Sequence, residues 1–426
     1  MKLKTNILFI ALGILAGQIP CIGQNNEYLG TFETVWKQVN DTYYDSTFGG
    51  FNWENAHDRY MPLVTAAEKD EDFYRLVNRM LWELNVSHTN LIRPGNLARA
   101  EPLVCAEGSP GLDLRLLNGE AVITSVKPGS PSWEAGLRPG YVIQAVDEIP
   151  IEQILHEAEL LMRPPYNYRA CIGIFTKAIL SRIYGTTGTE VLITYSEERG
   201  EKSDTILMRT KRSGAAVGPN GILYLAIDFE AKRLENGIGY IRLNTFQQPL
   251  APMISGAIRS MGNVSGIILD LRGNAGGEIE EMPDLFLNER ALLFLRRSIN
   301  GETKMFFDPA DNAYTGPLVL LIDQLSGSAC ELFAGSLQAS GRAVVIGECS
   351  PGAVMESDMK IFPDGSILMY PVAQLATPDG TVLEGHGVVP DIEVSLEREM
   401  LLKGVDSQID AAIRYLQKDG QNKPSQ

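Results

Sequence analysis

The stretch LIDQLSGSACELFAG, residues 321–335, contains a strand, a turn and the start of a helix. Its apolar run ends at Asp323 and is typical of a buried strand. A turn rich in Ser and Gly follows, and the pattern predicts a helix over about residues 329–340. Ser328 therefore lies at a helix N-terminus, where backbone N–H groups lack partners within the helix and the dipole is positive.

Ser328 has two interpretations at this position. Serine is a preferred N-cap residue, and the local sequence by itself favours that structural role. A serine at a helix N-terminus can also attack a carbonyl group while backbone N–H groups stabilise the oxyanion. The stretch does not contain the G-x-S-x-G elbow of lipases, so a nucleophilic role needs evidence from elsewhere in the chain.

A second glycine-rich turn follows another apolar run. GIILDLR, residues 266–272, predicts a buried strand, and GNAGG, residues 273–277, predicts the turn. Gly276 and Gly277 can adopt positive φ and expose their N–H groups, so this turn can supply an oxyanion donor. The alternative is a plain turn before a helix near residues 282–287. The phosphate-binding pattern G-x-x-x-x-G-K-[ST] is absent.

Three regions differ in their hydrophobic pattern. Residues 28–91 show helical spacing, and residues 103–210 show short strands and turns, with a helical insertion. Strands alternate with helices over residues 221–394, which predicts an α/β core. The tail, residues 396–416, predicts one last helix. The strands expected in the α/β core are 239–244, 266–272, 318–323 and 343–348, and the helices are 249–261, 282–287 and 329–340.

Composition excludes several classes of protein. The chain has 426 residues, which suggests two to four domains. Its 37 basic and 53 acidic residues give a net charge of −16, which argues against a nucleic-acid partner. There is no H-E-x-x-H motif, Cys/His cluster or dinucleotide fingerprint, so we expect neither a metal nor an organic cofactor.

The N-terminus predicts export. Lys2 and Lys4 precede an apolar run at residues 7–15, and Cys21 and Gly23 supply the small residues expected before a cleavage site. The run is shorter than the roughly 20 residues of a spanning helix. We therefore expect a signal peptide cleaved after Gly23, a periplasmic or extracellular protein, and no stable membrane span once the signal is removed.

A serine nucleophile needs a general base. His88 stands in LNVSHTNL beside Ser87, where the first helical region ends. His386 stands in LEGHGVVPD, two residues after Glu384. The other two histidines lie in polar helical surroundings, where exposure is expected. The four histidines are His57, His88, His156 and His386.

Four motifs in order, GYIRLNTF, GIILDLRGNAGG, SGSACELFAGSLQASGRAVVIGE and GTVLEGHGVVPDIEV, resemble the peptidase family of C-terminal processing proteases and the tricorn protease core. They span about residues 239–394. SPGLDL with ITSVKPGSPSWEAGLRPGYVIQAVDEIPI resembles the PDZ domain of such proteins. VSHT, after a helical region, is similar to the segment that carries the histidine of the tricorn branch.

The resemblance implies an α/β multidomain protein. Its catalytic core is expected to be a crotonase-like α/β spiral, preceded by a PDZ-like β domain and an N-terminal helical bundle. The expected division is signal peptide 1–23, helical bundle 25–100, PDZ-like domain 103–212 with a helical insertion at 152–184, catalytic core 220–396, and C-terminal helix and tail 397–426.

The resemblance also implies a mechanism. One branch of the family uses a Ser–Lys dyad, but Ala353 occupies the place of that lysine, in CSPGAVM. The tricorn branch uses Ser, His, Ser and Glu. Mapped by motif, Ser328 is the nucleophile, His88 is the base, and Ser87 or Glu384 orients and polarises the imidazole. His386 is the alternative base.

By the same resemblance, the oxyanion donors are the N–H groups of Gly276 or Gly277 and of Ala329. The substrate is a peptide or protein, cleaved at or near its C-terminus. The chain departs from the family pattern at Val86, where an acidic residue is common, and at Gly327, where Ala is usual. The PDZ-like carboxylate loop comprises Gly111, Leu112, Asp113 and Leu114.

Asp113 stands where the family has Gly and would repel a peptide C-terminus unless its side chain points away. Asp113 and Val86 therefore support one alternative, a catalytically silent protein that holds a peptide as an added strand. A second alternative is a serine esterase of small molecules. Labelling of Ser328 by a fluorophosphonate separates the silent protein from the enzymes, and peptide turnover separates a peptidase from an esterase.

Overall fold

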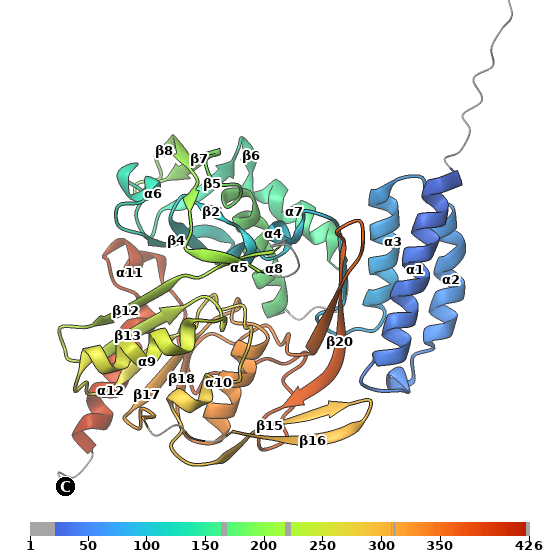
Figure 1. The fold of residues 1–426 in the computed structure, drawn as a ribbon. Coiled ribbons are helices and arrows are strands. Elements are labelled where there is room, and N and C mark those ends of the chain that lie inside the picture. The colour runs from blue at the N-terminus through green and yellow to red at the C-terminus, as the bar shows by residue number, and fades with distance from the viewer. Residues whose placement is uncertain (1–21, 163–167, 218–222, 308, 310–311, 423–426) are drawn as a thin grey trace, which may run out of the picture.

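The computed structural model describes residues 22–162, 168–217, 223–307, 309 and 312–422 (Figure 1). The expected signal peptide, residues 1–23, lies almost entirely outside the described residues. Among the helices of the described part, none has the length and apolar character needed to cross a membrane.

A six-stranded sheet forms the core of the C-terminal half. Its strands from β13 to β21 run parallel, and β12 joins antiparallel at one edge. Every residue of β14 and β17 is buried, as the apolar runs predict. In spatial order the strands are β12 (Phe229–Arg233), β13 (Gly239–Leu243), β14 (Ile267–Asp270), β17 (Leu318–Ile322), β18 (Val344–Gly347) and β21 (Ile392–Glu393).

Helices cover both faces of this sheet. On one face, α9 (Leu250–Met261) and α10 (Ala329–Ala339) pack against side chains such as Ile267. On the other, α12 (Ser407–Asn422) packs against alternate residues such as Ile268. This arrangement buries the central strands β14 and β17 on both faces, which explains why they have no polar alternation.

Two helix predictions were wrong in detail. The helix expected at residues 282–287 is a single 3-10 turn, η3 (Pro283–Leu285). The tail forms two helices, α11 (Arg398–Leu402) and α12, rather than one. Gly404, at φ 75°, adopts the left-handed conformation that ends many helices, and the chain turns there.

An antiparallel sheet that the sequence analysis did not predict lies beside this core. Its strands are β1 (Asn90–Ile92), β20 (Ile367–Ala376), β15 (Ala291–Ser298), β16 (Gly301–Phe307) and β19 (Glu356–Ile361). The short strand β1 pairs with β20, with Leu91 opposite Leu368. This pairing attaches the segment after His88 to the C-terminal half of the chain.

Three N-terminal helices lie side by side at one end of the molecule (Figure 1). They are α1 (Ile22–Thr42), α2 (Trp53–Thr65) and α3 (Asp70–Trp82), and η1 (Phe48–Gly50) lies between the first two. Phe32 of α1 and Met80 of α3 share one apolar cluster with Leu368 of β20. The helices therefore pack onto the sheet that holds β1.

The PDZ-like region, residues 103–212, forms a third sheet. Its order is β3 (Leu112–Leu117), β4 (Glu120–Val126), β5 (Val142–Val146), β7 (Glu190–Ser196) and β8 (Lys202–Met208), with β6 (Ile149–Pro150) paired to β5. Strands β7 and β8 form an antiparallel hairpin around Arg199–Gly200. The insertion forms helices α7 (Ile151–Leu161) and α8 (Tyr168–Ile183), and α6 (Pro131–Glu134) is a single turn.

Short elements join the three sheets. They are α4 (Leu97–Ala100), α5 (Pro102–Cys105), the pair β2 (Gly108–Ser109) with β9 (Thr210–Lys211), and the pair β10 (Gly214–Val217) with β11 (Leu223–Ala226). Leu325, which follows β17, packs into the apolar cluster of the PDZ-like region. The turn that leads to Ser328 thus contacts that region directly.

Candidate active site

Ser328 is the N-cap of α10 and adopts φ 57° and ψ −128°. Positive φ is uncommon for a residue other than glycine, and such strain costs about 1–3 kcal/mol and concentrates at functional sites. The Ser328 N–H donates to the carbonyl oxygen of Ala353 at 2.9 Å. The sharp turn between β17 and α10 is thereby attached to the loop after β18.

Glu331 shapes the same loop from the first turn of α10. Its buried carboxylate accepts hydrogen bonds from Ser350 Oγ at 2.6 Å, Gly352 N at 2.7 Å, Ala353 N at 2.9 Å and Ser328 N at 3.2 Å. Burial raises the pKa of Glu331 to about 7, against the opposing effect of these donors. Glu331 was not expected from the sequence, although a Glu three residues after a helix-start Ser is a recognisable signal.

Ser87, His88 and Glu384 form a continuous hydrogen-bonded relay. Ser87 Oγ donates to Glu384 Oε2 at 2.9 Å, and His88 Nδ1 lies 2.8 Å from Ser87 Oγ. Because the serine proton is directed to the carboxylate, Nδ1 of the imidazole is the donor to Ser87. This tautomer leaves His88 Nε2 without a proton, as a general base requires.

Residues 353–355 connect this relay to the nucleophile's turn. Glu384 Oε2 accepts hydrogen bonds from Val354 N at 2.7 Å and Met355 N at 3.1 Å. Both residues directly follow Ala353, whose carbonyl oxygen binds the Ser328 N–H. The carboxylate that orients Ser87 is therefore fixed to the chain segment that holds Ser328.

His88 is held in an unusual backbone conformation, at φ 56°. Burial lowers the pKa of its imidazole below the ordinary value, while the charge of Glu384 acts in the opposite direction. A lowered pKa keeps the ring neutral near pH 7. The neutral ring is the form that can accept a proton from a serine hydroxyl.

The glycine turn lies against the start of α10. A side-chain carbon at Gly276 would stand 2.8 Å from the N atom of Ala329 and 2.8 Å from Ser328 Cβ, so only glycine fits. The Gly276 N–H donates to Asn274 Oδ1 at 2.8 Å. Within the described residues, the N–H groups of Gly277 and Ala329 have no hydrogen-bond partner.

The other histidines lie outside this arrangement. His386 is exposed, and its Nδ1 lies 3.0 Å from the carbonyl oxygen of Glu384 rather than from the carboxylate. His57 contacts Glu33 among the N-terminal helices, and His156 is exposed on α7. The relay therefore contains one of the four histidines, the one expected from the sequence.

A cavity of about 310 Å³ opens beside the glycine turn. A side-chain carbon at Gly277 would stand 2.9 Å from Nε2 of Gln247, which lines this cavity. The lining residues are Phe246, Gln247, Gln248, Ala251, Glu278, Glu280, Glu281 and Met282. Over the described part of the chain, no group of three or more His, Cys, Asp or Glu residues could hold a metal ion.

The PDZ-like carboxylate loop lies at the start of β3. Asp113 is buried and forms ion pairs with Arg115 and Arg242 at 2.9 Å each. These charges hold the pKa of Asp113 below its usual value despite its burial. Its side chain therefore faces arginines and does not present an unpaired negative charge to a peptide. Leu112 and Leu114 pack in the core.

Comparison with known proteins gives three family matches. Residues 237–394 match peptidase family S41, residues 24–82 match the tricorn protease C1 domain, and residues 122–166 match a PDZ domain. The carboxyl-terminal-processing protease of Synechocystis sp. is 28% identical over 402 residues, covering 90% of this chain and 86% of the relative. The chloroplastic carboxyl-terminal-processing peptidase 2 of Arabidopsis thaliana is 27% identical, covering 87% and 70%.

Solved structures agree on the fold. The photosystem II D1 C-terminal processing protease has a TM-score of 0.56 at 23% identity, covering 88% of this chain and 96% of that one. The tricorn protease has a TM-score of 0.54 at 20% identity, covering 93% and 37%. The fold is thus mixed α/β with several domains, and the chain is a serine peptidase. Residues 237–394 match peptidase family S41, and the chain is similar over most of its length to carboxyl-terminal-processing proteases.

Proposed function

We propose that the chain cleaves peptide bonds of polypeptides or oligopeptides, at or near their C-termini, through an acyl-enzyme on Ser328 with His88 as general base. One observation carries the proposal. The relay from Glu384 through Ser87 to His88 is bound, through residues 353–355, to the turn that holds Ser328 in its strained conformation. The names of the relatives support the C-terminal specificity.

In this mechanism His88 Nε2 takes the proton of Ser328 Oγ as that oxygen attacks the scissile carbonyl carbon. The imidazolium is stabilised through Ser87 by the charge of Glu384. His88 then gives the proton to the leaving amine, and the acyl-enzyme forms. In the second half, His88 takes a proton from water, the hydroxide attacks the acyl carbon, and the proton returns to Ser328.

Gly277 and Ala329 supply the oxyanion donors in this scheme. Their N–H groups are unpaired within the described residues, whereas the Gly276 N–H is committed to Asn274 Oδ1. Of the two glycines expected from the sequence, we therefore assign Gly277 as the donor. Gly276 is required for a different reason, because its lack of a side chain lets the turn approach Ala329.

Ala353, at the place of the dyad lysine, still contacts the nucleophile's turn. Ala353 binds Ser328 through its carbonyl oxygen and Glu331 through its N–H, so it contributes through the backbone alone. The cavity beside Gly277 is the space in which a substrate side chain next to the scissile bond would lie.

We also assign the finer features of the fold here. The parallel sheet flanked by α9, α10 and α12 supports a crotonase-like α/β spiral, and α1–α3 support an N-terminal helical bundle. Apolar clusters centred on α1–α3, on the PDZ-like region and on the parallel sheet support the domain division 25–100, 103–212 and 220–396. The basic and apolar N-terminus supports export to the periplasm or the extracellular space.

The test is a peptide library incubated with wild-type protein and with Ser328→Ala. We expect the wild type to release C-terminal fragments and Ser328→Ala to release none, because the acyl-enzyme cannot form. Turnover of small esters without any peptide cleavage would support an esterase instead. Equal cleavage by Ser328→Ala, measured by mass spectrometry, would contradict the proposal.

A further inference from the structure

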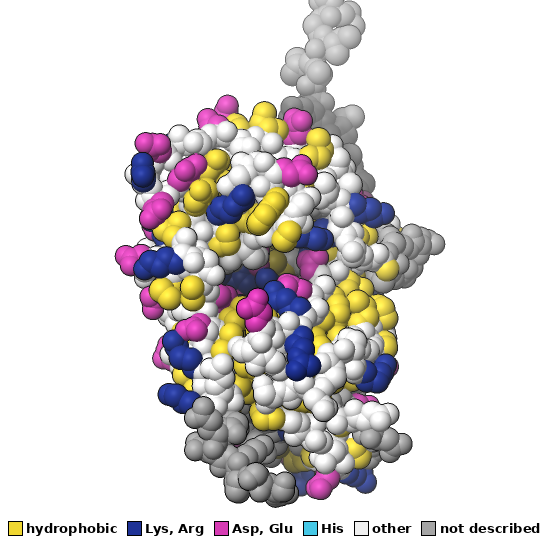
Figure 2. Space-filling view, turned by 90° about the vertical axis from the view of Figure 1, so that its left-hand side faces the viewer, with side chains coloured by type: hydrophobic (Ala, Val, Ile, Leu, Met, Phe, Trp, Pro, Cys, Tyr) yellow, Lys and Arg dark blue, Asp and Glu magenta, His cyan; other side chains and the backbone are white. Residues whose placement is uncertain are grey.

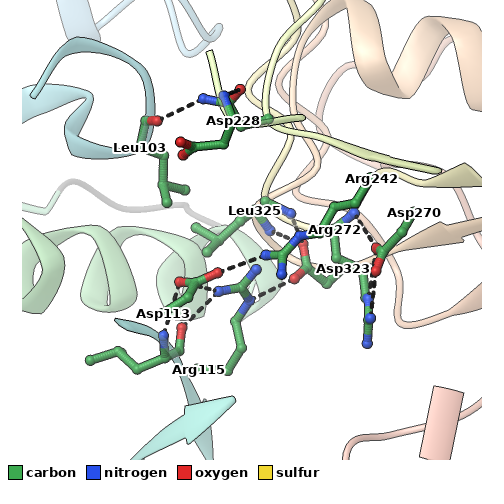
Figure 3. A network of polar contacts seen from close by, with 12 residues as sticks. Leu103, Asp113, Arg115, Asp228, Arg242, Asp270, Arg272, Asp323 and Leu325 are labelled. Atoms are coloured by element: carbon green, nitrogen blue, oxygen red, sulfur yellow. Dashed lines mark hydrogen bonds and ion pairs between the residues drawn. The ribbon is translucent and has the colours of Figure 1, made fainter. Parts of the chain in front are cut away.

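A buried network of alternating charges joins β3 of the PDZ-like region to the catalytic core (Figure 3). Arg115 Nε donates to Asp323 Oδ2 at 2.6 Å, and Arg115 Nη1 donates to Asp113 Oδ1 at 2.9 Å. Arg242 of β13 binds the other oxygen of Asp113 at 2.9 Å. Arg115 and Asp323 are 5% and 2% exposed, so water does not screen this pair.

The second oxygen of Asp323 reaches both functional turns. Asp323 Oδ1 accepts hydrogen bonds from Gly273 N at 3.0 Å and from Leu325 N at 3.0 Å. Gly273 begins the turn that contains Gly277, and Leu325 lies three residues before Ser328. A single carboxylate therefore holds the first residues of the oxyanion turn and of the nucleophile's turn.

The two turns also bind each other. The Gly327 N–H donates to the carbonyl oxygen of Asn274 at 2.9 Å. The distance between the N–H groups of Gly277 and Ala329 depends on how these turns are placed. That placement is fixed at one end by the Gly327 contact and at the other by Asp323.

We propose that Arg115 is a positioning residue for the oxyanion site, acting through Asp323 on both turns. The inference rests on the proposed function of Ser328. A buried carboxylate without a partner is strongly unfavourable, and the Arg115 guanidinium is the charged partner of Asp323 there. The guanidinium also packs on the turn, since a side-chain carbon at Gly273 would stand 2.9 Å from Arg115 Nη2.

The edge of β3 supports this role. PDZ domains bind a peptide tail as a strand added to a sheet edge, and β3 is the last strand of its sheet. Its backbone is already bonded to side chains of this chain. Tyr184 OH donates to Leu112 O at 2.8 Å, Leu114 N donates to Asp113 Oδ1 at 2.9 Å, and Arg115 Nη1 donates to Leu114 O at 2.7 Å. The backbone of β3 therefore makes contacts within the chain, and its Arg115 side chain contacts the catalytic core.

The network lies between the PDZ-like region and the catalytic core. On the face shown in Figure 2, basic and acidic side chains gather about a hollow halfway down. Arg115 and Asp323 are 208 residues apart in the chain, so their contact exists only when the PDZ-like region is packed on the core. Catalytic competence thereby becomes dependent on that packing.

The test compares Arg115→Met with Arg242→Met, using a short peptide substrate. Arg242 binds Asp113 in the same network and leaves the contacts of Asp323 intact, so it is the matched control. We expect Arg115→Met to lower kcat roughly tenfold to a thousandfold with little change in KM, as for a misplaced oxyanion donor. Affinity for a peptide aldehyde, whose hemiacetal oxygen occupies the oxyanion site, falls in parallel. Arg242→Met stays within about threefold of wild type on both measures.

The double variant Arg115→Met/Asp323→Asn tests whether the losses in Arg115→Met arise from simple misfolding. It removes both charges together and keeps an amide oxygen that can accept from the N–H groups of Gly273 and Leu325. We expect it to recover at least part of the kcat and aldehyde affinity lost in Arg115→Met. Equal losses in Arg115→Met and Arg242→Met, or a change in KM alone, would overturn the inference. If Ser328→Ala is inactive while Arg115→Met keeps its kcat, the proposed function stands and only this inference fails.

Discussion

At the scale of single residues, the environment of His88 decides how the site responds to pH. Ser87 and Glu384 fix the tautomer, and burial lowers the pKa of the imidazole. The pairing of Ser87, His88 and Glu384 was expected from resemblance, and the structure brings these three side chains together. Glu331 was missed although its spacing from Ser328 is the capping-box signal, and Asp323 was missed because its partners Arg115 and Gly273 are distant in the chain.

The pH dependence of kcat/KM follows from this environment. His88 acts as a base only when it is neutral, and its lowered pKa extends the neutral form to lower pH. We therefore expect the acidic limb of kcat/KM to have its midpoint below 6.5, the ordinary pKa of histidine. The measurement is a pH profile with a neutral peptide. A midpoint near pH 7 that disappears in Glu331→Gln would contradict this, since Glu331 has a pKa of about 7.

At the scale of elements, the short strand β1 connects the histidine to the rest of the molecule. The Asn78 side chain of α3 binds both backbone groups of Leu91. Its Nδ2 donates to the carbonyl oxygen of Leu91 at 2.9 Å, and the Leu91 N–H donates to its Oδ1 at 2.7 Å. Leu91 in turn pairs with Leu368 of β20. Ser87 and His88 lie between these anchors, in the segment that joins α3 to β1.

Replacing Asn78 tests that connection. Asn78→Ala leaves the N–H and carbonyl oxygen of Leu91 without these partners, so we expect a loss of about 1–3 kcal/mol in the free energy of unfolding. We also expect a lower kcat/KM, because His88 is less well held. Urea unfolding and peptide kinetics measure the two effects. Asn40→Ala, on the exposed face of α1, is the control, with a change within about 0.5 kcal/mol. Unchanged kinetics in a destabilised Asn78→Ala would show that β1 does not position His88.

The elements that the sequence predicted are those with local patterns. The apolar runs of β14 and β17 and the spacing of α9 and α10 reflect burial on the sheet and are visible residue by residue. The sheet containing β15, β16, β19 and β20 was missed. β16 and β19 carry many polar residues, so they have no apolar run that would mark a strand. β20 pairs with β1 across most of the chain length, and no local pattern indicates such a pairing.

At the scale of the whole molecule, the candidate site draws its residues from both halves of the chain. His88 follows the N-terminal helices, Ser328 lies in the core, and Arg115 comes from the PDZ-like region. The net charge of −16 and the apolar content describe an ordinary globular protein and indicate none of these contacts. Only the packing of the regions brings these residues together, which explains why Ser328, His88 and Glu384 were expected from resemblance to a family rather than from composition.

The most direct test of the catalytic assignment is the rate of fluorophosphonate labelling, with the labelled residue mapped by mass spectrometry. We expect labelling of wild-type protein at Ser328, none in Ser328→Ala, and a rate lowered by roughly two orders of magnitude or more in His88→Ala, because the base is lost. His386→Ala should label almost as fast as wild type, since its ring lies outside the relay. A larger effect of His386→Ala than of His88→Ala, or no labelling of folded wild-type protein between pH 6 and 9, would contradict the account.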